Sequence, residues 1–301
     1  MTQDGRAGAL EFNLDPRVAI RRLFVYCVSM ELLLVFLDYH MNYGRWTEIR
    51  AIRKLFDISL EDALPSWFAT TQAFLICVTL WLIWIVVRRQ GVSGARSAGW
   101  FVLASFFTWI AIDDGARVHE RLGSGFRKIS QAGDPGSFTA QGLDAFPSYS
   151  WQFFLLPIFA GLGLFTFIFL WRELKQWYGG VLVFAAMSCL AFAVGLDFIE
   201  GLDAAHPWNL YTRIAGNYPS LHDFTTVRFS HPPYDTLRHF SKSLEEFIEM
   251  FGMTILWTVF LTQLGHGLTE VRLRVGRGLP ATDLGAELAT GRAATLGAGT
   301  H

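Results

Sequence analysis

Residues 66–87 read SWFATTQAFLICVTLWLIWIVV, a stretch that contains no charged side chain. A helix needs about 20 predominantly apolar residues to cross the hydrocarbon core of a bilayer, so this stretch predicts a membrane-spanning helix. Five further stretches have a similar character. The predicted spans are residues 23–40, 66–87, 98–120, 150–171, 177–200 and 244–264. The expected fold class is therefore all-α, a polytopic membrane protein built as a bundle of about six transmembrane helices.

The composition of the 301-residue chain agrees with a membrane protein. Hydrophobic residues make up 52% and charged residues only 17%, whereas soluble domains carry roughly 25% charged residues. The net charge of -1 excludes the strongly basic surface of a nucleic-acid-binding protein. Cys27, Cys77 and Cys189 lie in separate apolar runs, so we expect small core residues and neither a metal knuckle nor a disulfide framework.

The distribution of basic residues predicts an orientation. The short connections at 88–96 and 172–176 are rich in Arg and Lys, Arg21 and Arg22 precede the first span, and three arginines follow the last. The positive-inside rule places these segments, and with them both termini, in the cytoplasm. Acids and a proline precede the first apolar run, unlike in a cleaved signal peptide. We expect one transmembrane domain over 1–277 and a disordered Gly-, Ala- and Thr-rich tail over 278–301.

Three longer loops then face outward. In residues 42–64, Trp46, Ile49, Ile52 and Phe56 fall near one helical stripe, which predicts an interfacial helix. Residues 121–149 are rich in Gly, Ser and Pro and are expected to form a loop. Residues 201–242 predict an ordered extracytoplasmic cap, with four histidines that we interpret mainly as surface or packing residues: His206, His222, His231 and His239.

Acidic and histidine residues gather at the predicted outer ends of four spans. Spans one and three have uninterrupted apolar runs of only about fifteen residues, so their helices should continue through these polar ends to cross the bilayer. Ionisable groups at that depth are costly and usually mark sites. The candidate metal ligands are Asp113, His119, Glu120, Asp197, Glu200, Glu246 and Glu249. Carboxylates with imidazole suit Fe, Mn or Zn, and an oxygen-only subset suits Ca or Mg.

A second group is expected to support these ligands or to form a proton path: Glu31, Asp38, His40, Arg117 and Glu245. On a continuous helix, Asp113 and Glu120 share one face with Arg117 between them. Glu31 lies seven residues before Asp38, so the two could line a proton path, or Glu31 could be a protonated group bound to a neighbouring helix.

Structural alternatives exist for several of the acids. Asp113 and Arg117 could form a local ion pair, and the spacing of Ser243 and Glu246 fits a capping box at the start of a helix. Three further acids could simply be solvated at helix ends: Asp114, Asp203 and Glu245.

Four strings carry a resemblance: LEDALPSWFAT (60–70), IDDGARVHE (112–120), DFIE (197–200) and LEEFIEM (244–250). They resemble a group of uncharacterised multi-pass bacterial membrane proteins with a D-[DE]-x4-HE, DxxE and EExxE pattern. Asp114 stands where the group suggests Glu. The resemblance covers spans two to six and implies a bacterial inner-membrane protein, but no activity.

The sequence therefore predicts an integral membrane metalloprotein with a site at the outer face, acting on a lipid or a lipid-soluble substrate as a hydrolase or an oxidoreductase. Its partners would be membrane lipid and other membrane subunits, and no nucleic acid. Two alternatives remain at this point: a non-catalytic subunit of a larger membrane complex, and a proton or cation transporter. The chain has no GxSxG, HExxH or Walker motif that would assign another chemistry.

Overall fold

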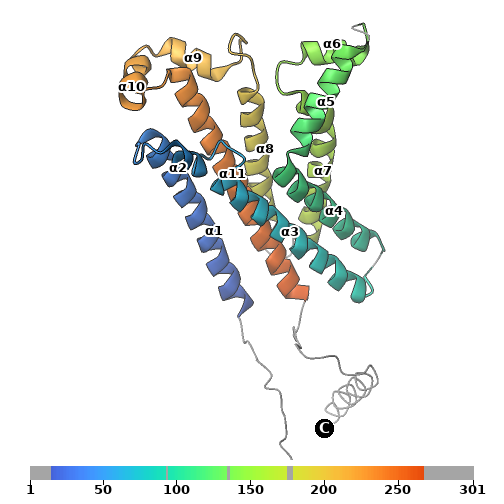
Figure 1. The fold of residues 1–301 in the computed structure, drawn as a ribbon. Coiled ribbons are helices and arrows are strands. Elements are labelled where there is room, and N and C mark those ends of the chain that lie inside the picture. Colours follow the sequence, from blue (N-terminus) through green and yellow to red (C-terminus); the bar gives the residue numbers. More distant parts are fainter. Residues whose placement is uncertain (1–14, 93, 134–135, 175–178, 268–301) are drawn as a thin grey trace, which may run out of the picture. The chain divides into compact units, whose positions relative to one another are not determined.

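The computed structural model describes residues 15–92, 94–133, 136–174 and 179–267. All regular elements in these ranges are helical (Figure 1). In chain order they are α1 (Pro16–Asp38), the π-helical turn η1 (Tyr39–Tyr43), α2 (Arg50–Leu55), α3 (Leu64–Arg89), α4 (Gly94–Ala116), α5 (Val118–Ala132), α6 (Phe138–Ala145), α7 (Ser150–Leu174), α8 (Gly179–Glu200), α9 (Leu210–Asn217), α10 (Ser220–Phe229) and α11 (Pro233–Gly267). The predicted tail at 278–301 lies outside the described residues.

Five of these helices are long and apolar enough to cross a membrane: α3, α4, α7, α8 and α11. The prediction of a multi-pass helical membrane protein is therefore confirmed. The remaining predicted span falls on α1, which has 23 residues but carries Arg21, Arg22, Glu31 and Asp38. α11 has 35 residues and begins well before the predicted span at 244–264, because its polar first turns continue the same helix.

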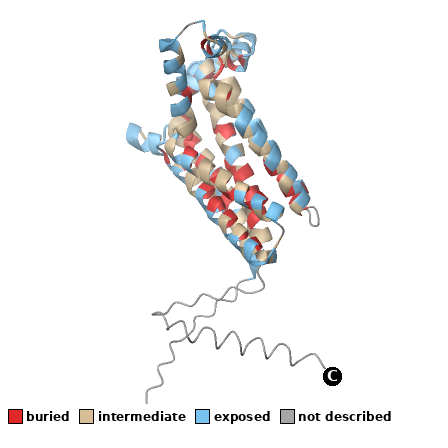
Figure 2. Ribbon diagram, turned by 90° about the vertical axis from the view of Figure 1, so that its right-hand side faces the viewer, coloured by how far each residue is buried: buried red, intermediate tan, exposed pale blue. Residues whose placement is uncertain are grey.

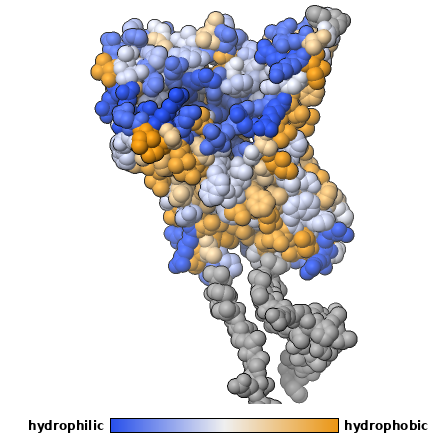
Figure 3. Space-filling model, viewed as in Figure 1, coloured by the Kyte–Doolittle hydropathy of each residue, from blue (hydrophilic) through white to orange (hydrophobic). Residues whose placement is uncertain are grey.

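α11 is the central helix of the bundle and packs against α1, α3 and α8, while α3 also packs against α4. The core between these helices contains fully buried large side chains, among them Leu80, Trp100, Leu256 and Phe260. Buried residues follow the inward faces of the long helices, and exposed residues their outer faces (Figure 2). A hydrophobic belt crosses the molecular surface below a strongly hydrophilic end that carries the short helices (Figure 3).

The predicted third span is broken at Arg117. This residue has a left-handed backbone (φ 53°), so α4 ends at Ala116 and α5 starts in a new direction at Val118. A non-glycine residue in this region is uncommon and marks a local constraint. The expectation that Asp113 and Glu120 share one helical face is therefore wrong. The expectation of a loop over 121–149 is also wrong, since α5 and α6 occupy much of it.

Two other expectations about local structure are corrected. Within residues 42–64 the helical residues are the last two of η1, the six of α2 and the first of α3. The helix in this segment is therefore short, and it includes Ile52 but not Trp46, Ile49 or Phe56 of the predicted apolar stripe. Ser243 lies inside α11 rather than at its start, and its hydroxyl donates to Asp38 Oδ2 at 3.0 Å. The capping box is therefore wrong, because the preceding turns of α11 already supply the backbone acceptors. Among the expected core cysteines, Cys27 and Cys77 are buried and Cys189 is half-buried.

We expect Gly123→Ala to destabilise the contact between α5 and α7. A Cβ atom at this buried glycine would lie 2.6 Å from the backbone nitrogen of Trp151, and overpacking of this kind costs about 1–3 kcal/mol. Gly125→Ala on the same helix is the matched control, because nothing lies within 4 Å of its added Cβ and alanine favours the helix by about 0.5–1 kcal/mol. In thermal unfolding in detergent, Gly123→Ala should melt at a lower temperature than Gly125→Ala. Equal melting temperatures of the two variants would contradict close packing of α5 against α7.

Candidate metal centre

An acidic cavity of about 220 Å³ lies among the ends of α4 and α8, the starts of α3, α5 and α7, and the first half of α11. Its wall includes eight carboxylates, which come from α4, α5, α8, α11 and the loop before α3: Glu61, Asp113, Asp114, Glu120, Asp197, Glu245, Glu246 and Glu249. Only two permanently charged cations, Arg117 and Lys242, line it with them. Such an excess of carboxylates is favourable only with protons or bound cations.

His119 is held in place by Asp113. The His119 amide donates to Asp113 Oδ1 at 2.7 Å, and His119 Nδ1 lies 2.6 Å from Asp113 Oδ2. The turn at Arg117 makes this possible, because it folds the first turn of α5 back onto the end of α4. Burial lowers the pKa of His119, but the hydrogen bond and the charge of Asp113 outweigh it, so the pKa lies above its usual value. Asp113 contacts Nδ1, so Nε2 is the ring nitrogen that would bind a metal ion, after loss of its proton.

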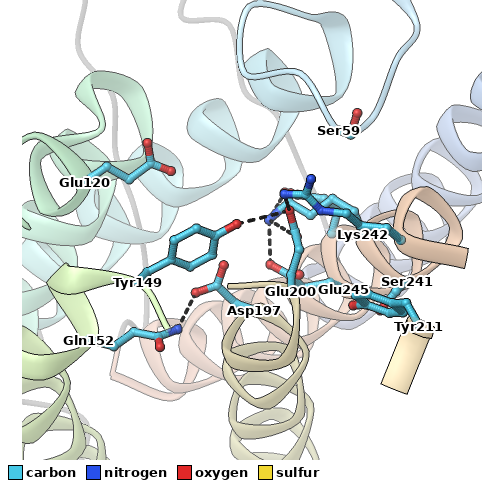
Figure 4. Close-up of polar contacts among 12 residues, drawn as sticks. Ser59, Glu120, Tyr149, Gln152, Asp197, Glu200, Tyr211, Ser241, Lys242 and Glu245 are labelled. Atoms are coloured by element: carbon cyan, nitrogen blue, oxygen red, sulfur yellow. Dashed lines mark hydrogen bonds and ion pairs between the residues drawn. The ribbon is translucent and has the colours of Figure 1, made fainter. Parts of the chain in front are cut away.

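Lys242 reaches a group of carboxylates from α8 and α11. Its Nζ lies 2.7 Å from Glu245 Oε1, 3.3 Å from Glu246 Oε1 and 3.8 Å from Glu200 Oε2. Asp197, Glu200 and Glu245 each offer an oxygen within 4.8 Å of the others. Figure 4 shows these three acids beside Lys242, whereas Glu120 stands apart. The lysine thus already supplies one positive charge where acids converge.

Glu200 and Asp197 are also fixed by residues outside α11's acidic turns. The Tyr149 hydroxyl donates to Glu200 Oε1 at 3.3 Å, and Arg238 Nη2 lies 3.1 Å from the same oxygen. Gln152 Nε2 donates to Asp197 Oδ2 at 2.8 Å (Figure 4). Burial and the charge of Glu200 raise the pKa of Tyr149 to about 12, so its hydroxyl remains a donor at neutral pH.

Three buried carboxylate oxygens at this site form no hydrogen bond. Among the described residues these are Asp114 Oδ2, Glu200 Oε2 and Glu245 Oε2, of which Glu200 Oε2 has the 3.8 Å ion-pair contact with Lys242. Glu245 is only 4% exposed, so it is not the solvated helix-end residue that the sequence allowed. Buried unpaired carboxylate oxygens cost free energy unless another group binds them.

Arg117 pairs with other acids than Asp113, its expected local partner. Its guanidinium forms ion pairs with Glu61 and with Glu120, the latter at 2.6 Å. The pair with Asp113 is therefore wrong, because the left-handed backbone turns the arginine away from the preceding helical turn. Glu120 is consequently already paired on one oxygen.

Asp38 belongs to a different cluster. Its Oδ1 accepts from Asn42 at 2.9 Å and from the Ile58 amide at 3.3 Å, and its Oδ2 lies near His239 Nε2 at 2.8 Å as well as the Ser243 hydroxyl. Asp38, Asp57 and His239 also have potential ligand atoms close together, but donors already occupy both oxygens of Asp38. This cluster fastens α1, the loop before α3, and α11.

Glu31 and His40 also lie outside the acidic cavity. Glu31 is fully buried, and its Oε1 accepts from the Thr254 hydroxyl at 2.5 Å and from Gln72 Nε2 at 3.4 Å. This arrangement agrees with the interpretation that Glu31 is bound to neighbouring helices. His40 packs against the rings of Phe36 and Trp46.

Comparison with known proteins gives one family match. A family described as a domain of unknown function (DUF8692) matches residues 24–264, which cover most of the chain. The chain belongs to this family. No curated protein and no solved structure matches it.

In this member of DUF8692, the cavity brings together six of the seven candidate ligands, Asp113, His119, Glu120, Asp197, Glu246 and Glu249. The seventh, Glu200, does not line the cavity, but its Oε2 lies 3.8 Å from Nζ of the cavity residue Lys242. Of the supporting group, only Arg117 and Glu245 line the cavity. Sequence reasoning missed five contributors: Glu61, Tyr149, Gln152, Arg238 and Lys242. Lys242 had a detectable signal, because it precedes Glu245 and Glu246 by one helical turn.

Proposed function

We propose that this DUF8692 chain is an integral membrane metalloprotein that binds a divalent cation in the acidic cavity. The observation that carries the proposal is the convergence of eight carboxylates and an oriented histidine on one small cavity with only two fixed cations. A cation would neutralise part of this charge.

The ligands would come mainly from α5, α8 and α11. His119 would bind through Nε2, with Asp113 fixing its ring, as a carboxylate commonly does for a metal-bound histidine. Asp197, Glu246 and Glu249 would supply oxygens, with Glu120 and Glu200 able to join if they exchange their arginine partners. This mixture of oxygens with one imidazole suits Fe, Mn or Zn better than Ca. Asp113 thus becomes an orienting residue rather than a ligand.

The walls of the cavity support a lipid or a lipid-soluble substrate. Apolar side chains lie beside the acids, including Ala69, Ile110, Phe159 and Val194, and most of them belong to candidate membrane-spanning helices. A bound metal would lower the pKa of water or polarise a substrate oxygen, and a carboxylate that does not bind the metal would act as general base. A hydrolase or an oxidoreductase would use the same residues.

The proposal places the protein in the bacterial inner membrane. α1 would add a sixth crossing, both termini would be cytoplasmic, and the acidic cavity would open toward the outer face under a cap that contains α9 and α10. The arginine-rich connections support this orientation through the positive-inside rule. A proton pathway is less well supported, because Glu31 and Asp38 each bind neighbouring helices instead of leading into the cavity.

Metal analysis of the purified protein tests the proposal. We expect about one Fe, Mn or Zn per chain after incubation with each metal and desalting, measured by inductively coupled plasma mass spectrometry. His119→Ala and the double variant Glu246→Gln/Glu249→Gln should weaken binding by at least about 10–100-fold, the cost of removing a group that only supports a ligand, because these residues would bind the metal directly. Asp144→Asn is the control, because this acid is exposed and lies outside the cavity.

Size-exclusion profiles and melting temperatures of the same samples show whether each variant remains folded. Metal near zero in the folded wild-type protein with every metal would contradict the proposal. Equal metal content in the wild type and in both folded cavity variants would place the metal elsewhere. Incubation of the metal-loaded and chelator-treated protein with a membrane lipid extract, followed by lipid mass spectrometry, then tests for a product.

A further inference from the structure

A second, larger cavity lies between α1, α8 and α11, at the end of the bundle away from the acidic cavity. It measures about 730 Å³ and is lined by the first three turns of α1, by Leu182 of α8 and by the second half of α11. On α11 its lining begins at Phe251, after the last acid of the metal centre, Glu249. This groove is therefore separate from the proposed metal centre.

The groove combines an apolar wall with a basic mouth. Ile20, Phe24, Leu182, Phe251 and Ile255 form its wall. The hydroxyls of Thr258 and Thr262 donate to carbonyls of their own helix, so they are already satisfied. A wall of this kind accommodates a hydrocarbon chain.

The mouth is formed by Arg17 and Arg21, which lie one helical turn apart on α1. Both are exposed, and in the described part of the chain neither forms an ion pair. Asp15 also lines the groove, but its carboxylate accepts the Arg17 amide as the cap of α1 at 2.9 Å. Hydrophilic side chains mark this lower end of α1 beneath the hydrophobic belt (Figure 3).

We propose that this groove binds one anionic phospholipid. The phosphate would lie between Arg17 and Arg21, and an acyl chain would follow Phe24, Leu182 and Ile255 toward the bilayer centre. Arginine matches phosphate oxygens geometrically, and basic pockets between transmembrane helices on the cytoplasmic side typically bind anionic headgroups. A second copy of the chain fits less well, because it would bury two arginines that form no ion pair with any residue in the described ranges.

The proposal is tested with the full chain by native mass spectrometry, using dioleoyl phosphatidylglycerol and dioleoyl phosphatidylcholine as probes. We expect the wild type to retain one phosphatidylglycerol with at least a tenfold preference over phosphatidylcholine. Arg17→Gln/Arg21→Gln should reduce the retention of phosphatidylglycerol about 10–30-fold and abolish the preference, consistent with the contribution of two basic groups at a membrane surface. Arg22→Gln/Arg89→Gln changes the net charge equally at exposed positions outside the groove and should retain the preference.

A second pair of variants tests the apolar wall. Leu182→Trp should fill the groove and reduce retention of phosphatidylglycerol at least tenfold with both arginines intact. Leu32→Trp places the same side chain at an exposed position of α1 outside the groove and should have no effect. Equal retention of the two lipids by the wild type would overturn the proposal. So would equal losses in the two arginine double variants, or a dimer without lipid as the dominant species.

Discussion

Asp38→Ala lowers the free energy of unfolding by about 3–5 kcal/mol, the cost of removing one partner from a buried charged cluster. Asp38 is only 2% exposed, and its two oxygens bind groups from η1, from the loop before α3 and from α11. Without the carboxylate, the Ile58 amide and the Ser243 hydroxyl lose their acceptor in a buried environment. We therefore expect separation of α1 from α11 to begin here.

Denaturant or thermal unfolding in detergent measures the effect. Asp38→Asn preserves the shape of the side chain and one acceptor oxygen, so its free energy of unfolding should fall roughly half as much as that of the alanine variant. Asp144→Ala removes an exposed acid and should stay within about 0.5 kcal/mol of the wild type. An Asp38→Ala protein as stable as Asp144→Ala would show that this cluster does not hold the helices together. Because Asp38 lies outside the acidic cavity, metal content per folded chain should not change.

Lys242→Met has the second large effect. It lowers the free energy of unfolding of the metal-free protein by about 3 kcal/mol, at the lower end of the cost of breaking a buried ion pair. The side chain is 21% exposed and contacts Glu200, Glu245 and Glu246. Its removal leaves these carboxylates close together without the positive charge between them. Repulsion among them, together with burial, then favours the unfolded state.

A second substitution distinguishes loss of charge balance from loss of packing. Glu245→Gln in the Lys242→Met background removes one negative charge and should restore more than about 1 kcal/mol, because the two residues are in direct contact. Divalent cations should raise the melting temperature of Lys242→Met more than that of the wild type, since they bind the folded state and replace the missing charge. Lys128→Met, at an exposed position of α5, serves as the control. No restoration by Glu245→Gln would contradict an electrostatic role for Lys242.

The candidate site was partly predictable because it lies at helix ends that hydropathy locates. Asp197 follows a long apolar run, and the acids of α11 stand just before one, so their depth in the bundle can be estimated from sequence. His119 joins Asp113 for a reason that periodicity could not supply. The left-handed backbone of Arg117 ends α4 and turns α5 back, whereas a continuous helix would have carried Glu120 onto the face of Asp113.

Asp38 shows the opposite case. It stands at the same predicted depth as the other acids, yet the direction of its side chain depends on how α1 rotates against α11. That rotation brings His239 and Ser243 to Asp38 and keeps it out of the acidic cavity. Lys242 was missed because a lysine beside three acids in sequence resembles an ordinary solvated helix face, and only its packing against α8 brings it to Glu200.

The sequence by itself determined that this is a multi-pass helical membrane protein and where most of its long helices lie, because transfer of a side chain into lipid depends on local composition and adds along the chain. Tertiary structure alone decided which acids share a cavity, which ones fasten helices, and which cations accompany them. Those outcomes depend on helix breaks and on the rotation of one helix against another, and both are set by contacts between residues far apart in the chain.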